Sequence, residues 1–288
     1  MVNRREPSFE SLGESSRIGT TQTTSCSPMP TSRFQQNLLR IVRDRKIHES
    51  ARADRLDSIY WYMQKNSKCI REGNFKDICS SDLGMLFQIT DEEFFDGEVS
   101  RVCEQKAARP LSFRLSTRMT TSGGMTTMQS SNSRRKPTTE FEIAIATTPL
   151  FATFRQQSTA IVSGVRCRDR LQALQRIMEH EMVHLIEMLL WNDSNCSASP
   201  FKNVVRRFFG HTESNHQLLT PRDLARIQLG IKLGDHVLFK VEGRELNGHV
   251  NRITKRATIL VEHPKGVRYT DGRTYQKFYV PLNKLKLA

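Results

Sequence analysis

The chain has few apolar residues for its length. They make up 37% of 288 residues, below the ~45–50% typical of globular domains, which predicts that part of the chain stays outside a folded core. No run approaches the ~20 apolar residues that cross a bilayer, so we do not expect an integral membrane protein. The first thirty residues lack the apolar core of a signal peptide, which argues against secretion.

Closely spaced cysteine pairs are also missing. The chain has six cysteines and no CxxC sequence, which argues against a zinc ribbon and a disulfide framework. Unpaired cysteines of this kind favour a reducing compartment, so we expect a cytoplasmic protein, nucleoid-associated in a bacterium or nuclear in a eukaryote. The cysteines are Cys26, Cys69, Cys79, Cys103, Cys167 and Cys196.

Positive charge is abundant. The chain has 44 Lys and Arg against 30 Asp and Glu, a net charge of +14. Such an excess favours polyanions as partners, nucleic acid first. Charge alone leaves a second interpretation open, because many basic proteins bind no specific partner.

Three segments of the chain differ in composition and residue pattern. Residues 1–33 are rich in Ser, Thr, Pro and Gly, and we expect a disordered tail. Residues 34–228 mix helical and strand patterns, which predicts an α+β domain. From about Ile231, glycine turns recur at short intervals between strand-like runs, which predicts a small all-β barrel over residues 231–288.

The pattern predicts individual elements as well. Helices are expected near Phe34, around residues 59–63, over residues 168–191 and over residues 200–209, with turns at Asp96-Gly97 and Gly123-Gly124. Alternation predicts strands over residues 111–116 and 141–146, joined through a solvated loop at residues 129–139. In the C-terminal part, strands are expected at residues 237–241, 248–253, 257–261 and 278–282.

An HExxH sequence lies within the long predicted helix. His180 and His184 are about one turn apart, so both imidazoles project from one face and can bind one Zn²⁺. Glu181 can then take a proton from a metal-bound water, which predicts a catalytic general base. The alternative is a pair of solvated histidines, which the apolar surroundings disfavour.

A third protein ligand is expected for a catalytic zinc site. We predict His211, because it follows Gly210, where the chain leaves a helix and can fold back. His216 is the next candidate, and an ordinary pair of loop histidines is the alternative interpretation. The other downstream candidates are Glu187, Asp193 and Glu213.

These features together resemble the SprT-like family of zinc metallopeptidases, relatives of the DNA-repair protease Spartan, over about residues 80–220. The resemblance implies a zincin-like fold, His180 and His184 as zinc ligands, Glu181 as general base, and substrates that are proteins bound or crosslinked to DNA. It depends on HEMVH together with Leu86-Phe87, Phe94-Phe95-Asp96-Gly97, residues 111–119, residues 123–126 and the strand at residues 141–146.

The chain departs from the family pattern in two places. Where the family commonly has HGxxF, with its third histidine, this chain has residues 197–201, Ser-Ala-Ser-Pro-Phe. The zinc ribbon that some members carry is replaced by the basic C-terminal segment.

In zincins an exposed edge strand pairs with extended substrate. We assign that role to residues 141–146, with an ordinary buried strand as the alternative.

The C-terminal segment resembles small SH3-like or KOW-type barrels. Residues 231–288 contain twelve basic and five acidic side chains, a net charge of +7. Interleaved aromatic residues could stack on bases, or could instead fill the core of a solvated barrel. We predict DNA or RNA contacts through Arg252, Lys255, Arg256, Arg268 and Lys277.

The sequence therefore predicts a zinc-dependent peptidase with a basic barrel that recruits it to nucleic acid. Its substrate is expected to be a protein or peptide, and its cofactor one Zn²⁺. The rival hypothesis is a non-catalytic nucleic-acid-binding or transcription-associated protein in which the metal only braces the fold.

Overall fold

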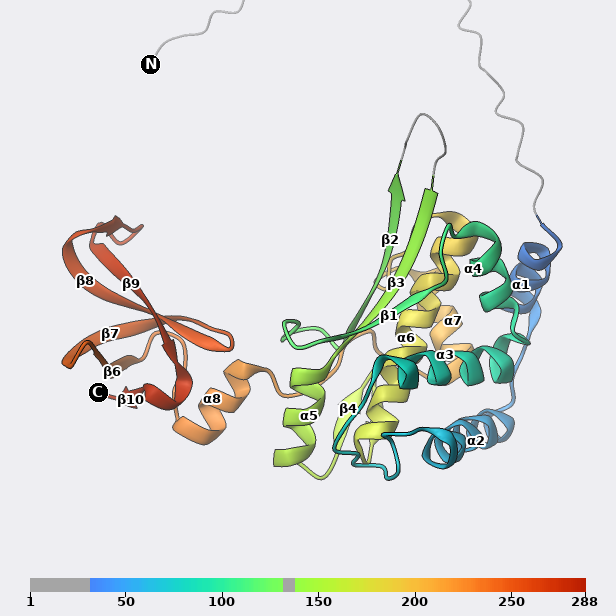
Figure 1. The fold of residues 1–288 in the computed structure, drawn as a ribbon, viewed down its shortest axis with the longest axis horizontal. Helices are drawn as coiled ribbons and strands as arrows, with labels where there is room; N and C mark the ends of the chain where they lie inside the picture. The colour runs from blue at the N-terminus through green and yellow to red at the C-terminus, as the bar shows by residue number, and fades with distance from the viewer. Residues whose placement is uncertain (1–31, 132–137) are drawn as a thin grey trace, which may run out of the picture. The chain divides into compact units, whose positions relative to one another are not determined.

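The computed structural model describes residues 32–131 and 138–288 and has a mixed α+β fold (Figure 1). This confirms the predicted α+β class. The predicted disordered tail lies outside the described residues up to Thr31, and Ser32 already caps the first helix by accepting a hydrogen bond from the backbone N–H of Gln35. The helices are α1 (Arg33–Asp44), α2 (Glu49–Asn66), α3 (Ser80–Phe95), α4 (Glu98–Lys106), α5 (Thr147–Gln156), α6 (Arg170–Trp191), α7 (Ser199–Phe209), α8 (Pro221–Leu229) and the 3₁₀ turn η1 (Leu282–Lys284).

The strands form three sheets. A three-stranded sheet has the order β1-β3-β2, a two-stranded ribbon pairs β4 with β5, and a five-stranded sheet has the order β10-β6-β7-β8-β9. The strands are β1 (Ser112–Ser116), β2 (Gly124–Ser131), β3 (Thr138–Ala146), β4 (Ala160–Val162), β5 (Val165–Cys167), β6 (His236–Val241), β7 (Arg244–Ile253), β8 (Arg256–Arg268), β9 (Thr274–Pro281) and β10 (Lys286–Leu287).

The first sheet corrects two predictions. Strand β3 contains residues 141–146, pairs in parallel with β1 and antiparallel with β2, and is therefore central rather than an edge. Strands β1 and β2 are the two edges, and β2 begins in residues expected to be a turn and ends in residues expected to be a loop. The predicted loop at residues 129–139 is wrong at both ends, because residues 129–131 belong to β2 and residues 138–139 to β3; residues 132–137 lie outside the described part.

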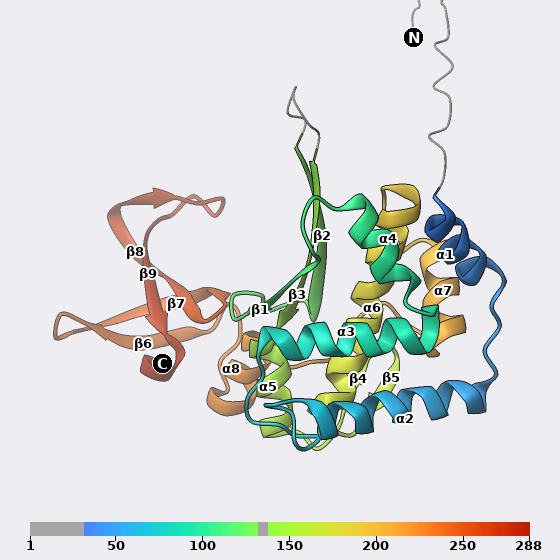
Figure 2. The ribbon, with the colours of Figure 1, turned by 45° about the vertical axis from the view of Figure 1, so that its right-hand side comes forward.

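Helix α6 runs through the middle of the helical part, and both ribbon views place it beside β2 and β3 (Figures 1 and 2). Asp169 caps its first turn by accepting a hydrogen bond from the backbone N–H of Gln172. Asn192 ends it in the left-handed conformation, with φ at 57°, directly after the predicted helix end at residue 191. Because side chains around most of its circumference are buried, its position is fixed from several sides.

Aromatic packing holds α7 against α3. The Phe95 and Phe208 rings are stacked with centroids 4.8 Å apart, and Phe94 meets Phe209 edge-on at the same distance. Gly210 ends α7 with φ at 74°, in agreement with the sequence prediction. The apolar periodicity of these helices therefore builds one large core around α6.

The C-terminal strands enclose a second apolar core. Four strands overlap the ranges expected from sequence, and β10 adds a fifth, with β9 and β10 as the edges of the described sheet. The sequence missed α8, which begins with a Thr220–Asp223 capping box and contributes Ala225 to this second core. Closure of these strands into a barrel, and the predicted domain boundaries, stay predictions.

Across the described part of the chain, no helix combines the length and the apolar content needed to span a membrane.

Candidate metal centre

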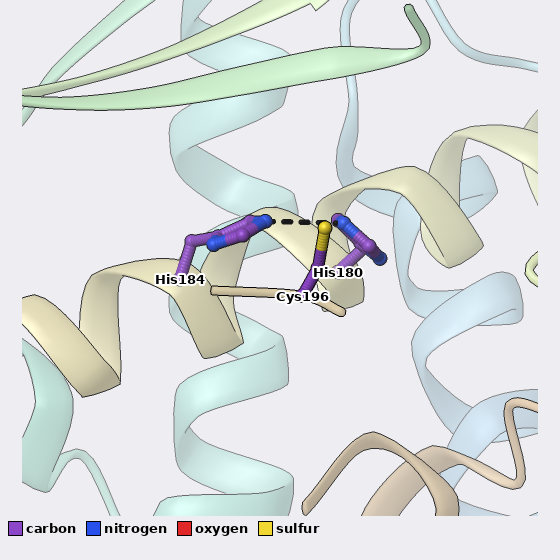
Figure 3. A group of neighbouring side chains, drawn as sticks. All are labelled: His180, His184 and Cys196. Atoms are coloured by element: carbon purple, nitrogen blue, oxygen red, sulfur yellow. Dashed lines mark hydrogen bonds between the residues drawn. The ribbon is translucent and has the colours of Figure 1, made fainter. Parts of the chain in front are cut away.

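The two histidines of HExxH face each other on α6. Their Nε2 atoms are 3.2 Å apart (Figure 3). Two nitrogens that each lie ~2.05 Å from one tetrahedral Zn²⁺ would be ~3.3 Å apart. The spacing therefore fits a shared ion without rearrangement of the helix.

Hydrogen bonds set the tautomer of His184. Its Nδ1 lies 2.6 Å from Ser194 Oγ, and that hydroxyl donates its single hydrogen to Glu187 Oε2 at 2.6 Å. The hydroxyl must then accept from Nδ1–H, which leaves the lone pair on Nε2, facing His180. A carboxylate that acts on a ligating imidazole in this way orients the ring and raises its basicity.

Burial keeps both rings neutral. It lowers the pKa of His180 to about 3, with the neighbouring His184 as a smaller contribution, and it lowers the pKa of His184 to about 4. Metal binding requires deprotonated nitrogens, so near neutral pH no proton has to be removed first.

Cys196 supplies a third donor that the sequence analysis missed. Its Sγ and one nitrogen of each histidine all lie within 4.8 Å of one another, and Figure 3 shows the three side chains pointing together. Cys196 lies in the connection between α6 and α7, directly before residues 197–201, where the family pattern led us to look for a histidine. Thiolate is a preferred zinc ligand, so this cysteine could have been considered.

The structure does not bring His211 to this group. His211 is buried, and its Nε2 lies 2.8 Å from Glu179 Oε2, which also accepts a hydrogen bond from Arg176 Nη1 at 2.9 Å. The chain does fold back after Gly210, but it directs this ring into the core. Burial lowers the pKa of His211, and Glu179 opposes that shift.

The remaining candidates are distributed around the centre. His216 lines the same cavity as the histidine pair, and its Nδ1 accepts a hydrogen bond from the Leu218 backbone N–H at 3.3 Å. That bond leaves Nε2–H as a donor on a neutral ring. Glu187 accepts the hydrogen bond from the Ser194 hydroxyl, while Asp193 and Glu213 are exposed to solvent.

The Glu181 side chain, on α6, faces the edge strand β2. Its Oε2 is 2.9 Å from Thr126 Oγ1, and a Cβ placed on Gly124 would come within 2.6 Å of its Oε1. Burial raises the pKa of Glu181 to about 7, against hydrogen bonds from Thr126 that lower it. A carboxyl group with a pKa near the working pH can both accept and return a proton.

A cavity of about 520 Å³ joins these groups. His180, Glu181 and His184 form one wall, and residues 121–126, which lead into β2, form another. His216 and Cys196 are the other ionisable side chains of its lining. An extended chain beside β2 would therefore pass close to the two histidines and Glu181.

All five basic residues predicted to bind nucleic acid are exposed. Arg252, Lys255 and Arg256 surround the β7–β8 connection, Arg268 ends β8, and Lys277 is in β9 with its Nζ 5.5 Å from the centroid of the Tyr269 ring.

The aromatic residues of this segment divide between surface and core. Tyr279 is 66% exposed, whereas Tyr275 is buried and Phe278 packs against the second core. Some of these rings therefore fill the core and at least one is free for stacking.

No family model, curated protein or solved structure matches this chain. The resemblance to SprT-like peptidases consequently stays a prediction based on the residues quoted above.

Proposed function

We propose that this protein is a zinc-dependent peptidase with a zincin-like catalytic domain. The observation that carries the proposal is the spacing of 3.2 Å between two neutral Nε2 atoms on α6, beside Glu181 and an edge strand in one cavity. The ligands would be His180, His184 and Cys196. Two nitrogens and one sulfur leave the fourth tetrahedral position open, as in catalytic zinc sites.

A bound Zn²⁺ would polarise the scissile carbonyl and lower the pKa of water at the site. Glu181 would take the proton of the attacking water and pass it to the leaving amine. His216, with Nε2–H available, would donate a hydrogen bond to the carbonyl oxygen as negative charge develops on it.

Strand β2 would hold the substrate. As one of the two edges of its sheet, and the one that lines the cavity, it can add an extended peptide through main-chain hydrogen bonds, which carry little sequence preference. This role moves from β3, where the sequence analysis placed it, to β2.

The substitution Glu181→Gln tests the proposal in the full chain. We expect zinc content equal to wild type and loss of cleavage of an unfolded protein and of a protein crosslinked to DNA. Glu213→Gln, at an exposed carboxylate, is the matched control and should cut normally. A wild-type chain that binds zinc but cuts neither substrate would support the rival, a non-catalytic protein with a structural metal.

We also propose that the C-terminal strands form a barrel that binds DNA or RNA. The supporting observation is the exposure of all five predicted basic residues in a segment with a net charge of +7. Replacing Lys255, Arg256 and Arg268 with Glu should weaken binding and flatten its salt dependence, by ~0.9 in the log–log slope for each lost phosphate contact. Replacing Lys46, Lys65 and Lys76 with Glu, at exposed positions in the helical part, changes the net charge equally and is the control. Equal losses in both variants would show nonspecific attraction.

A further inference from the structure

The connection between α2 and α3 brings two cysteines and a carboxylate together. Cys69 Sγ and Cys79 Sγ are 3.6 Å apart, and Cys79 Sγ is 2.9 Å from Asp82 Oδ2. One donor atom from each of the three residues lies within 4.8 Å of the others. The two cysteines are partly exposed and Asp82 is buried, so the cluster has an anchored side and a side open to solvent.

The spacing suits a thiophilic divalent ion. Two sulfurs each ~2.3 Å from a tetrahedral Zn²⁺ would be ~3.8 Å apart, and a sulfur and a carboxylate oxygen ~3.6 Å apart. The sulfurs are already at nearly that separation. The shorter Cys79–Asp82 distance is that of a thiol donating its hydrogen to a carboxylate, and an ion that replaces this hydrogen needs an opening of ~0.7 Å.

Asp82 is held in position from several directions. Its Oδ1 accepts a hydrogen bond from Ser67 Oγ at 2.6 Å, and its Oδ2 accepts one from the Cys79 backbone N–H at 2.8 Å. The carboxylate thus keeps a fixed orientation toward the two thiols. A disulfide would use only the sulfurs, whereas a cation would use all three donors.

The same loop holds the start of the HExxH helix. The Leu171 backbone N–H donates to the Gly73 carbonyl at 2.9 Å, and the Arg170 backbone N–H donates to Asn74 Oδ1 at 3.1 Å. The Arg170 guanidinium also donates to the Phe75 carbonyl. Closing the loop at Cys69 and Cys79 would therefore restrain the residues that anchor α6.

We propose that Cys69, Cys79 and Asp82 bind a second Zn²⁺, with water as the fourth ligand, and that this ion braces the loop against α6. Binding releases the two thiol protons to solvent as the metal–sulfur bonds form. The site shares no residue with the His180 centre, so it stands whether or not the protein is a peptidase.

Cobalt is a suitable probe, because bonds from Co²⁺ to thiolates give charge-transfer absorption. The experiment uses the full chain with Cys196→Ser, reduced and metal-free, so that the other centre lacks its sulfur. We expect the absorption to saturate at one equivalent of the thiolate-bound ion, to disappear when Cys69→Ser is added, and to survive Cys103→Ala. Cys69→Ser leaves the Cys79–Asp82 cap of α3 in place, so folding should persist.

A second measurement follows the loop directly. In the Cys196→Ser chain, zinc should protect Cys69 and Cys79 from alkylation and raise the melting temperature. Adding Cys69→Ser should leave Cys79 open to alkylation in the presence of zinc and reduce the rise in melting temperature to the part that the two histidines on α6 contribute. The proposal is overturned if the absorption is absent, if it survives Cys69→Ser, or if mass spectrometry of protein purified with zinc finds the two cysteines joined as a disulfide.

Discussion

The substitution Gly124→Ala probes the contact between the edge strand and the proposed general base. The added Cβ would lie 2.6 Å from Glu181 Oε1 and 2.7 Å from its Cγ, whereas ordinary contacts begin at about 3.4 Å. Since Gly124 lies in β2, the carboxylate has to move, by ~0.8 Å. Misplacement by ~1 Å of a catalytic group can cost 10²-fold in rate, or ~2.7 kcal/mol in the barrier.

We therefore expect Gly124→Ala to lower kcat by about 10²-fold while zinc content stays unchanged, because the three atoms nearest to this Cβ all belong to Glu181, which is not a proposed ligand. Steady-state peptide cleavage together with metal analysis measures both. Gly84→Ala is the control: its Cβ meets only the Phe113 ring, at 3.6 Å, and the change in the interior of α3 should stabilise the fold by up to ~1 kcal/mol. Full activity in Gly124→Ala would refute the placement of Glu181.

Two further substitutions test separate parts of the proposed centre, and a third tests His211, which lies outside it. Ser194→Ala removes the link between His184 and Glu187, and zinc affinity in a chelator competition should fall ~10–100-fold. His216→Phe should lower kcat by ~10²-fold, with KM and zinc content unchanged. His211→Asn should reduce the loss of melting temperature in acid. Burial lowers the pKa of His211 in the folded chain, so on acidification the unfolded chain takes up a proton first. The melting temperature of the wild type therefore falls as the pH drops below 6.5, and that of His211→Asn should fall less.

A different result would contradict each of these three predictions. Unchanged zinc affinity in Ser194→Ala would show that the hydroxyl does not orient the ligand. A raised KM with constant kcat in His216→Phe would mean that the ring only binds substrate. A pH profile in His211→Asn that matches wild type would place the acid sensitivity in other groups.

Helices α1, α2, α6 and α7 overlap ranges expected from the sequence, whereas α3, α4, α5 and α8 were not predicted. The apolar period, the turn at Asp96-Gly97, the helix end at residue 191 and the helix end at Gly210 are local signals, and the structure ends α3, α6 and α7 at these positions. Strand β2 was missed because its sequence, GMTTMQSS, shows little apolar alternation. It is held by pairing with β3, which is a long-range interaction that periodicity does not report.

The candidate metal centre was predictable only where its geometry is local. His180 and His184 share a helix, so their spacing follows from the helical repeat. The third donor depends on how the chain returns after α6, and two histidines, a cysteine and several carboxylates were available for that position. The structure turns His211 toward Glu179 and brings Cys196 to the pair.

The Cys69–Cys79 contact shows the same limit. The two residues are ten positions apart, with no motif that joins them, and the loop between them brings them to 3.6 Å. Pairings of this kind depend on tertiary packing, here of the loop against α6.

X-ray absorption at the zinc edge tests the central claim most directly. The sample is the full chain with Cys69→Ser, loaded with one equivalent of Zn²⁺, so that only the His180 centre is filled. We predict imidazole nitrogens at ~2.0–2.1 Å and one sulfur at ~2.3 Å, with the sulfur lost when Cys196→Ser is added. A shell of nitrogen and oxygen without sulfur, or a shell without imidazole, would contradict the assignment of His180, His184 and Cys196.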